Sequence, residues 1–437
     1  MIAKKRVGFL TLGCKVNQYE SEAIAQNCRG MGYVTAGADE ICDLYIVNTC
    51  TVTQEADRKS CQMIRQLHRR NPAAPIIVTG CTAQRHPETV AAIEGVSAVV
   101  GNLRKLDCAV LADRFLSGNA PSEQIVQTTS LEGAAFEPMR IPSFPRTRQY
   151  IKIEDGCENH CAYCAICDAR GPVRSKRADD ILKEAISFRE NGCREIVLTG
   201  IETASYGKDT RDTLGDLLVR LDAALPDVRF RLGSVDPNLF RPAFLEKIAG
   251  LSTVAPHFHI SVQSGSSAVL RRMRRGYNAV QAADALQRIR AAIPGVMFTT
   301  DIIVGFPGET PEEFEETRRF LKEARFLKTH IFPFSARTGT EAAKMPQQIL
   351  QAEKHRRVRI LTEDEADMRR SIYESIVGSV FTVLFETQPQ PGIWSGHAAN
   401  FLEIRVPYNG NLHGTFADVC IVRACSNEEY CIGVLCQ

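Results

Sequence analysis

The sequence has no long apolar run and no strong excess of charge of one sign. Its 437 residues include 53 Lys and Arg and 51 Asp and Glu, a formal net charge of +2. No apolar stretch approaches the roughly 20 residues of a membrane-spanning helix, and the apolar residues 7–12 are too few for a signal peptide. We therefore expect a cytoplasmic protein without a membrane partner, in which any nucleic-acid site is a local basic patch.

The composition is that of a folded protein with two or three domains. Hydrophobic residues make up 44% of the chain and charged residues 24%, which is typical of globular proteins with a large core. The chain also contains 16 cysteines. In a reducing compartment this number favours metal binding over disulfide bonds.

Three closely spaced cysteines follow a predicted strand at residues 150–153. Cys157, Cys161 and Cys164 form a C-x₃-C-x₂-C run. A 4Fe–4S cluster ordinarily takes four cysteines, so three thiolates leave one iron without a protein ligand. An open position on a metal is where chemistry occurs. A zinc knuckle or simple buried thiols are the alternatives that this spacing leaves open.

The run resembles the radical S-adenosylmethionine (SAM) motif. In that superfamily the open iron binds the amino and carboxylate groups of SAM, and an electron from the cluster cleaves SAM to a 5′-deoxyadenosyl radical. Cys167 extends the run to a fourth thiol, where relatives usually carry proline. If Cys167 closed the cluster, SAM would have no iron to bind, so we favour the open cluster.

Three further cysteines occupy equivalent positions in three successive βα units. Short apolar strands are predicted over residues 6–12, 44–47 and 76–78, each followed by a turn and a helical pattern. Cys14, Cys50 and Cys81 follow these strands. Repeated βα units imply a parallel sheet, in which sites lie beyond the carboxyl ends of the strands. The pattern predicts a second three-thiolate cluster within residues 1–125, with coincidence among many cysteines as the alternative.

The segments that carry these cysteines resemble the N-terminal domain of the methylthiotransferase family. They include Gly13-Cys14-Lys15-Val16-Asn17-Gln18-Tyr19-Glu20, Asn48-Thr49-Cys50 and Thr79-Gly80-Cys81. In that family the three cysteines hold an auxiliary 4Fe–4S cluster. The first segment is most similar to the branch that acts on N6-threonylcarbamoyladenosine in tRNA. The resemblance spans nearly the whole chain and implies two 4Fe–4S clusters and SAM as cofactors.

A proline-containing linker at residues 126–145 precedes further βα units. Strands are predicted at residues 150–153, 195–199, 229–232, 258–262, 297–304 and 328–332. Six units are short of the eight of a closed barrel, so residues 146–370 are predicted to form an open (β/α)₆ partial barrel, which is also the radical SAM fold. Asp179 and Thr310 are predicted helix N-caps. Motifs at the strand ends resemble the family's SAM site at Tyr163, Glu202, Ser234, Gln263, Arg275 and Gly305.

Residues 371–437 are predicted to form a small β-barrel with strands at residues 380–385, 401–406, 415–424 and 430–435. This part resembles the TRAM domain, an OB-like module that binds RNA. The predicted RNA contacts are Arg271, Arg272, Arg274, Arg405 and Arg423. A solvated helix face is the alternative for the cluster at residues 271–275. The four cysteines of the barrel lack a C-x₂-C spacing and are interpreted as packing thiols rather than zinc ligands.

No Ser/His/Asp or paired-carboxylate constellation is evident in the sequence. An aromatic C–H has neither useful acidity nor a leaving group, so a radical that abstracts the hydrogen is a plausible route. The resemblance implies a tRNA methylthiotransferase that acts at C2 of N6-threonylcarbamoyladenosine next to the anticodon. Its implied partners are the tRNA anticodon stem–loop, a reductant protein and a sulfur donor, the last two without a motif that identifies them. Alternatives are an isopentenyladenosine tRNA or a ribosomal-protein side chain as substrate, or a non-catalytic iron–sulfur sensor that binds RNA.

Overall fold

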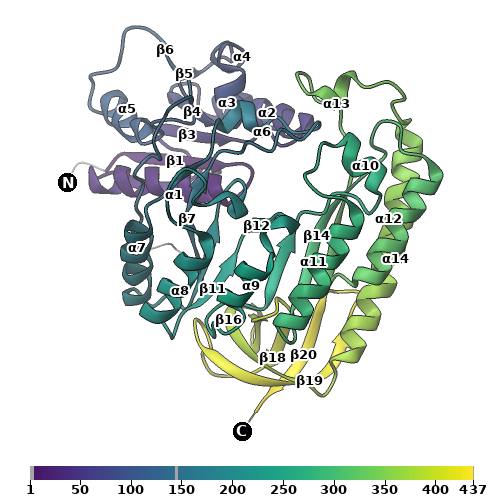
Figure 1. The fold of residues 1–437 in the computed structure, drawn as a ribbon. Helices are drawn as coiled ribbons and strands as arrows, with labels where there is room; N and C mark the ends of the chain where they lie inside the picture. The colour runs from purple at the N-terminus through teal and green to yellow at the C-terminus, as the bar shows by residue number, and fades with distance from the viewer. Residues whose placement is uncertain (1–3, 143–145, 437) are drawn as a thin grey trace.

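The computed structural model describes residues 4–142 and 146–436. Residues 143–145, the end of the predicted linker, lie outside the described part. An N-terminal α/β part and a C-terminal barrel lie at opposite ends of a central set of parallel strands (Figure 1). The prediction of an α/β chain that ends in a small barrel is confirmed.

The N-terminal part is one parallel sheet of order β2-β1-β3-β4-β5-β6. Its strands are β1 (Arg6–Thr11), β2 (Val34–Gly37), β3 (Leu44–Thr49), β4 (Ile76–Gly80), β5 (Val96–Val100) and β6 (Ile125–Gln127). Its helices are α1 (Lys15–Gly30), α2 (Gln54–Arg70), α3 (Cys81–Arg85), α4 (Pro87–Ala91) and α5 (Asp107–Leu116). Every residue of β3 and β4 is buried, because apolar clusters cover both faces of the sheet. The three predicted βα units are present, and β1, β3 and β4 are neighbours in the sheet.

Six parallel strands form the central part. They are β7 (Arg148–Lys152), β10 (Glu195–Thr199), β11 (Arg229–Leu232), β13 (His257–Ile260), β14 (Met297–Val304) and β15 (Lys328–Pro333). Hydrogen bonds join β11-β10-β7 and, separately, β12-β13-β14-β15, where β12 (Ser234–Val235) continues the path of β11. A short antiparallel pair, β8 (Glu154–Asp155) and β9 (Arg174–Ser175), brackets the cysteine loop. The strands do not close on themselves, which confirms the open six-unit barrel.

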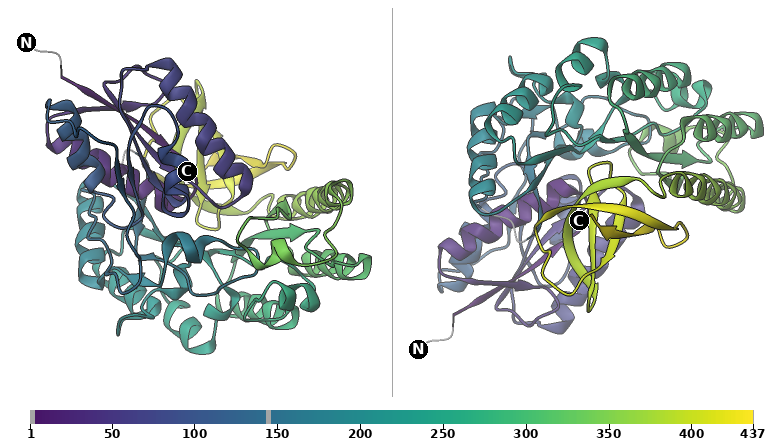
Figure 2. Two further views of the ribbon diagram at one scale, coloured as in Figure 1. Left: turned by 90° about the horizontal axis from the view of Figure 1, so that it is seen from above. Right: turned by 90° about the horizontal axis from the view of Figure 1, so that it is seen from below.

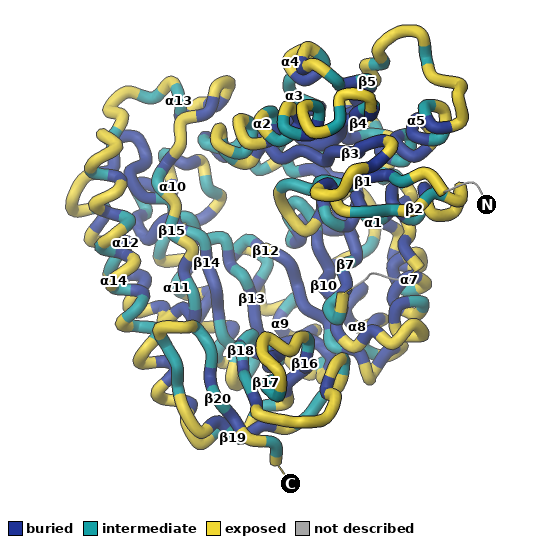
Figure 3. Tube along the Cα trace, turned by 180° about the vertical axis from the view of Figure 1, so that it is seen from behind, coloured by how far each residue is buried: buried dark blue, intermediate teal, exposed yellow. Residues whose placement is uncertain are grey.

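The central strands are largely buried (Figure 3), and helices lie along their outer side and in the loops at their ends (Figure 2). They are α6 (Ile166–Arg170), α7 (Ala178–Glu190), η1 (Thr203–Ser205), α8 (Leu214–Ala224), η2 (Pro237–Leu239), α9 (Pro242–Ile248), α10 (Ser267–Arg272), α11 (Ala279–Ala292), α12 (Pro311–Ala324), α13 (Glu341–Lys344) and α14 (Gln351–Ser375). None of the helices in the described residues combines the length and apolarity needed to cross a bilayer.

One of the two predicted helix caps is correct. Thr310 caps α12 through a capping box with Glu313, and Pro311 occupies the first turn, where its missing N–H costs nothing. The Asp179 prediction is wrong, because α7 begins at Ala178 with Arg177 at the N-cap position. Asp179 lies instead in the first turn and forms an ion pair with Arg220.

The C-terminal part is a closed barrel of order β16-β17-β18-β20-β19. Its strands are β16 (Val380–Gln390), β17 (Ile393–Ala398), β18 (Glu403–Pro407), β19 (Phe416–Cys425) and β20 (Tyr430–Leu435). The sequence pattern missed β17, where a Cβ on Gly396 would lie 2.2 Å from the Leu384 carbonyl oxygen. Such close approach requires glycine, which weakens the apolar alternation of a strand. Cys431 is buried as predicted, whereas Cys436 is exposed, so the packing interpretation fails for Cys436.

A buried arginine and a ring stack join the C-terminal barrel to the central strands. Arg231 on β11 donates from Nε to Glu195 Oε1 of β10 at 2.8 Å. Its Nη1 reaches the carbonyl oxygen of Ala399 at 3.0 Å, and the His257 ring stacks on Phe401 at 4.5 Å. The barrel is therefore held through backbone carbonyls that need a cation opposite them.

Replacing Arg231 by alanine is expected to destabilise the protein strongly. Glu195 is fully buried, and removing the arginine leaves much of its charge unpaired, which costs about 3–5 kcal/mol. Urea unfolding followed by circular dichroism measures this change. The exposed Arg423 is the matched control, and an Arg231→Ala effect no larger than that of Arg423→Ala would contradict the argument.

The predicted linker is not a free tether. Residues 125–127 extend the N-terminal sheet as β6. Further along, Leu131, Met139 and Ile141 are buried, and the last two belong to the core of the central part. The segment therefore holds the two parts together by packing.

Candidate active site

Three thiols meet at one edge of the N-terminal sheet. Cys14 follows β1, Cys50 follows β3 and Cys81 follows β4, and these strands are adjacent. The turn between β1 and α1 is tight, since Gly13 has φ +99° and a Cβ there would lie 2.8 Å from Cys50 Sγ. Only glycine tolerates both conditions. The local sequence thus brings the first two thiols close together.

The thiols of Cys14, Cys50 and Cys81 lie close enough together for their charges to interact. Burial, together with the neighbouring Cys81 and Cys14, raises the pKa of Cys50 to about 11. Burial also raises the pKa of Cys14, while Arg170 opposes this effect. The Cys14 residue is exposed to solvent. The site therefore combines three thiols with one nearby guanidinium.

A buried network of charges lies behind these thiols. Glu20 of α1 pairs with Lys105, with Lys152 of β7 at 2.7 Å and with Arg170 of α6 at 2.5 Å. Asp155 pairs with Lys152 at 2.7 Å and with Arg174 at 3.3 Å. Burial alone would raise the pKa of Glu20, but Arg170, Lys105 and Lys152 hold it well below its ordinary value. Sequence analysis missed this network, although Asn17, Glu20 and Ser21 are polar residues on the buried face of α1.

The second set of thiols lies in the loop between β8 and α6. Cys164 N–H donates to the Cys161 carbonyl oxygen at 2.9 Å, and Cys157 N–H donates to the Gly171 carbonyl oxygen at 3.0 Å. Burial raises the pKa of Cys164 to about 12, with Cys161 and Cys157 as further causes. A hydrogen bond with Cys167 and burial both raise the pKa of Cys157, so Cys167 lies beside one thiol of the set.

Neither cysteine set has the compactness of a single-metal site. Among the described residues, the one group of three potential ligands whose atoms all lie within 4.8 Å of one another is His259, Asp301 and His330. The sulfur atoms of each cysteine set are thus more widely spaced. A zinc ion draws its ligands close together, whereas each thiolate of a 4Fe–4S cluster binds a different iron. The wider spacing of both sets is compatible with a 4Fe–4S cluster.

A cavity of about 580 Å³ lies beside the second set of thiols. Its lining includes Cys161, Glu202, Asp236, Arg274 and Arg275, and this volume is within the usual range for small-molecule sites. Burial raises the pKa of Glu202 to about 7, and Asp236 adds to the effect. The cavity therefore presents acidic and basic side chains together, as an amino acid moiety would require.

Three of the predicted SAM contacts, Tyr163, Gln263 and Arg275, differ in how they are held near the cysteine loop. Arg275 is 5% exposed and donates to Asp236 Oδ2 at 2.8 Å and to Cys161 Sγ at 3.1 Å. Tyr163 packs edge-on against Phe306, with ring centroids 6.5 Å apart. Gln263 adopts φ +70°, an uncommon conformation for a non-glycine residue that marks a constrained position.

The other two predicted contacts lie at strand ends, as expected. Ser234 is exposed and begins β12. Gly305 follows β14 with φ +69°, and a Cβ there would lie 2.5 Å from Lys354 Cγ. Glycine is therefore required at the turn after β14.

The predicted RNA contacts differ in how free their charges are. Arg271 is exposed, whereas Arg272 pairs with Glu313 and Arg274 pairs with Glu341 at 3.5 Å. In the barrel, Arg405 lies over the Tyr430 ring at 3.7 Å and pairs with Glu403, and Arg423 is exposed. Arg271 and Arg423 are thus the members of the set that keep a free charge.

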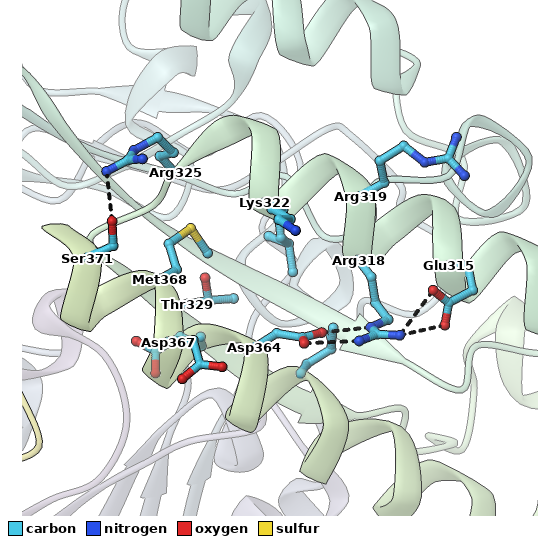
Figure 4. A pocket seen from close by; sticks show the side chains of 13 residues that line it. Glu315, Arg318, Arg319, Lys322, Arg325, Thr329, Asp364, Asp367, Met368 and Ser371 are labelled. Atoms are coloured by element: carbon cyan, nitrogen blue, oxygen red, sulfur yellow. Dashed lines mark hydrogen bonds and ion pairs between the residues drawn. The ribbon is translucent and has the colours of Figure 1, made fainter.

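A groove on the outer surface of the central part is lined mainly by acidic and basic side chains that pair with each other. It lies between α12 and α14 and has a volume of about 520 Å³. Arg318 bridges Glu315 and Asp364, and Arg325 reaches Ser371 (Figure 4). These contacts stabilise the packing of two helices, and they lie away from both sets of thiols.

Arg337 is a further residue that sequence analysis missed. It follows β15, is 3% exposed and donates to Thr51 Oγ1 at 2.7 Å and to Asp57 Oδ2 at 2.6 Å. Both partners belong to the N-terminal part, next to Cys50. Arg337 also lies near Cys164, whose pKa its charge lowers. The arginine therefore joins the loops that carry the two sets of thiols.

Two sequence families match the chain. The Radical SAM superfamily matches residues 151–321, and the Uncharacterized protein family UPF0004 matches residues 6–101. The two matches fall on the parts that carry the second and the first set of thiols, respectively. The division of the site between two structural units thus follows the division of the sequence between two families.

Relatives of known name match nearly the whole chain. "Threonylcarbamoyladenosine tRNA methylthiotransferase MtaB" of Bacillus subtilis is 38% identical, over 96% of this chain and 94% of the relative. The protein of the same name from Thermotoga maritima is 36% identical, over 95% and 94%. "tRNA-2-methylthio-N(6)-dimethylallyladenosine synthase" of Carboxydothermus hydrogenoformans is 32% identical, over 88% and 89%.

Solved structures share the fold at low sequence identity. The radical S-adenosylmethionine methyltransferase TsrM from Kitasatospora setae has a TM-score of 0.58 and 15% identity, and the match covers 90% of this chain and 77% of TsrM. The cobalamin-dependent radical enzyme OxsB has a TM-score of 0.51 and 13% identity, over 78% and 54% of the two chains. With relatives this similar over almost their full length, the chain belongs to the radical SAM methylthiotransferase family.

Proposed function

We propose that the protein converts N6-threonylcarbamoyladenosine next to the anticodon of tRNA to its 2-methylthio derivative. The observation that carries the proposal is the presence of two separate three-thiol sets, one in each of two adjoining structural units. The names of the relatives supply the substrate, since those with 36–38% identity carry the threonylcarbamoyladenosine name. We further propose that residues 1–125, 146–370 and 371–437 act as the methylthiotransferase, radical SAM and TRAM domains of a cytoplasmic enzyme.

The six cysteines are the proposed cluster ligands. Cys157, Cys161 and Cys164 would hold the radical SAM cluster, and Cys14, Cys50 and Cys81 would hold the auxiliary cluster. When bound, the clusters and SAM supply the electron transfer that cleaves SAM, the methyl group and an iron position for the sulfur that is inserted. A side-chain acid or base could not replace this chemistry, because the C2–H bond of adenine is not acidic.

The remaining residues of the site orient SAM. Glu202 and Arg275 provide an acceptor and a donor to the cavity beside Cys161, which suits the ammonium and carboxylate of an amino acid. Asp236 holds the Arg275 guanidinium and thereby limits its rotation. Tyr163, Ser234, Gln263 and Gly305 are the further proposed contacts of SAM.

The proposed partner is the tRNA anticodon stem–loop, whose unpaired bases can be turned out of the stack. We expect the free charges at Arg271 and Arg423 to contact phosphates, while the C-terminal barrel supports the loop. A double Arg271→Ala, Arg423→Ala variant should reduce the slope of log affinity against log salt by roughly 0.7 for each lost contact. Fluorescence anisotropy with a labelled stem–loop measures this slope.

Arg272→Ala is the matched control for this experiment. Its guanidinium already pairs with Glu313, so its removal should change the slope less than the loss of Arg271. An unchanged slope in the double variant would reject these two residues as phosphate contacts.

Nucleoside analysis of tRNA tests the proposed function itself. A strain without the gene should lose 2-methylthio-N6-threonylcarbamoyladenosine and retain its precursor, N6-threonylcarbamoyladenosine. Mass spectrometry of the tRNA nucleosides measures both. Loss of the isopentenyladenosine derivative, or of a modified ribosomal-protein side chain, would instead indicate the related substrates. Failure of the reduced protein to form 5′-deoxyadenosine from SAM would indicate a non-catalytic sensor.

A further inference from the structure

Arg170 connects the loop of one set of thiols to a thiol of the other. It ends α6, three residues beyond Cys167, and its side chain is fully buried. Its Nε donates to Cys81 Sγ at 3.2 Å, although 89 residues separate the two in sequence. Its Nη2 donates to Asn17 Oδ1 at 2.5 Å, and its Nη1 donates to Glu20. The guanidinium is thus fixed on several sides, with one N–H directed at a sulfur atom.

The charges around Arg170 are unbalanced. Four cations form ion pairs with only two carboxylates in this buried network; the cations are Lys105, Lys152, Arg170 and Arg174, and the carboxylates are Glu20 and Asp155. The nearby Glu137 accepts from the backbone N–H groups of Lys105 and Leu106, and burial raises its pKa. An excess of buried positive charge is costly unless an anion faces it. Thiolates at the Cys14, Cys50 and Cys81 site are such an anion.

We propose that Arg170 is a positioning residue that binds the Cys81 thiolate and raises the reduction potential of the auxiliary cluster. Reduction adds negative charge to a cluster, and hydrogen bonds to its sulfur ligands stabilise that charge. A charge-assisted bond from a guanidinium is a strong form of this contact. The loop that carries the radical SAM cysteines would then tune the other cluster. The inference rests on the proposed function, because it takes Cys81 as a cluster ligand.

The second set of thiols contains a comparable contact that serves as a reference. Arg275 Nη1 donates to Cys161 Sγ at 3.1 Å. This arginine is held by Asp236 and Tyr277, and no carboxylate of the Glu20 network touches it. Substitutions at Arg170 and Glu20 should therefore affect the auxiliary cluster and leave the radical SAM cluster unchanged.

Redox titration followed by electron paramagnetic resonance tests the proposal. The full-length protein with Cys157, Cys161 and Cys164 replaced by alanine, reconstituted with iron and sulfide, isolates the auxiliary cluster. In this background Arg170→Gln should shift the midpoint potential to lower values, because a positive charge is lost beside Cys81. Arg170→Lys should shift it less, and Glu20→Gln should shift it in the opposite direction, because a negative charge is lost.

The reciprocal background provides the control. With Cys14, Cys50 and Cys81 replaced by alanine, Arg170→Gln should leave the potential of the remaining cluster unchanged. An Arg170→Gln protein with full iron content and an unchanged auxiliary potential would overturn the proposal. If that variant retains no iron, the Glu20→Gln shift decides: a rise supports the proposal, and no rise overturns it.

The two hypotheses fail in different ways. A parent protein without Cys157, Cys161 and Cys164 that binds no iron at all would reject Cys14, Cys50 and Cys81 as cluster ligands, and with them the proposed function. A parent protein that holds a cluster whose potential does not change in the Arg170→Gln variant would reject the role of Arg170 alone and leave the proposed function standing.

Discussion

Replacing Cys81 by alanine should remove about half of the protein-bound iron and sulfide, roughly one 4Fe–4S cluster of two. Cys81 is 3% exposed and contacts Arg170, so an alanine there removes one of the three thiolates of the cluster and one hydrogen-bond partner of the guanidinium. We expect methylthiolated product to fall to background, while SAM cleavage by the other cluster continues. Iron and sulfide quantitation, together with product and 5′-deoxyadenosine assays, measures these effects.

Cys61 provides the matched control within the same part of the chain. It lies on α2, partly buried, and it is not among the thiols at the strand ends. Cys61→Ala should therefore retain both clusters and full product formation. Equal iron loss in the two variants would show that the Cys81 effect is general destabilisation rather than loss of a ligand.

Replacing Cys157 by alanine should remove the other half of the iron and abolish SAM cleavage. Three thiolates are the minimum that this loop offers for a cluster with one open iron. Formation of 5′-deoxyadenosine should fall to background, and methylthiolated product should be lost with it. The auxiliary cluster should remain, because its thiols lie on the separate N-terminal sheet.

Cys167→Ala distinguishes the open cluster from a closed one. Cys167 lies beside Cys157, and its replacement separates the effect of a neighbouring thiol from that of a fourth ligand. We expect full iron content and continued SAM cleavage. Loss of the radical SAM cluster in Cys167→Ala would contradict the three-thiolate site.

The sequence by itself was sufficient to predict the architecture and the two sets of thiols. Strand periodicity located β1, β3 and β4. The rule that sites lie at the carboxyl ends of parallel strands predicted that Cys14, Cys50 and Cys81 lie together. The same local patterns indicated the six central strands and the terminal barrel. The patterns did not predict β17, in which Gly396 weakens the apolar alternation of a strand. They also placed the N-cap of α7 at Asp179, although the helix begins at Ala178.

Only the tertiary structure decided which charges face the thiols. Arg170 meets Glu20 across 150 residues, and Arg337 meets Asp57 across 280 residues. Secondary structure leaves a periodic trace because its contacts are a few residues apart. An ion pair between distant segments leaves no such trace, since it depends on how the sheet and the barrel pack together. The cysteines could therefore be found from their spacing in the sequence. Arg170 and Arg337, which place positive charge beside the thiols, could not.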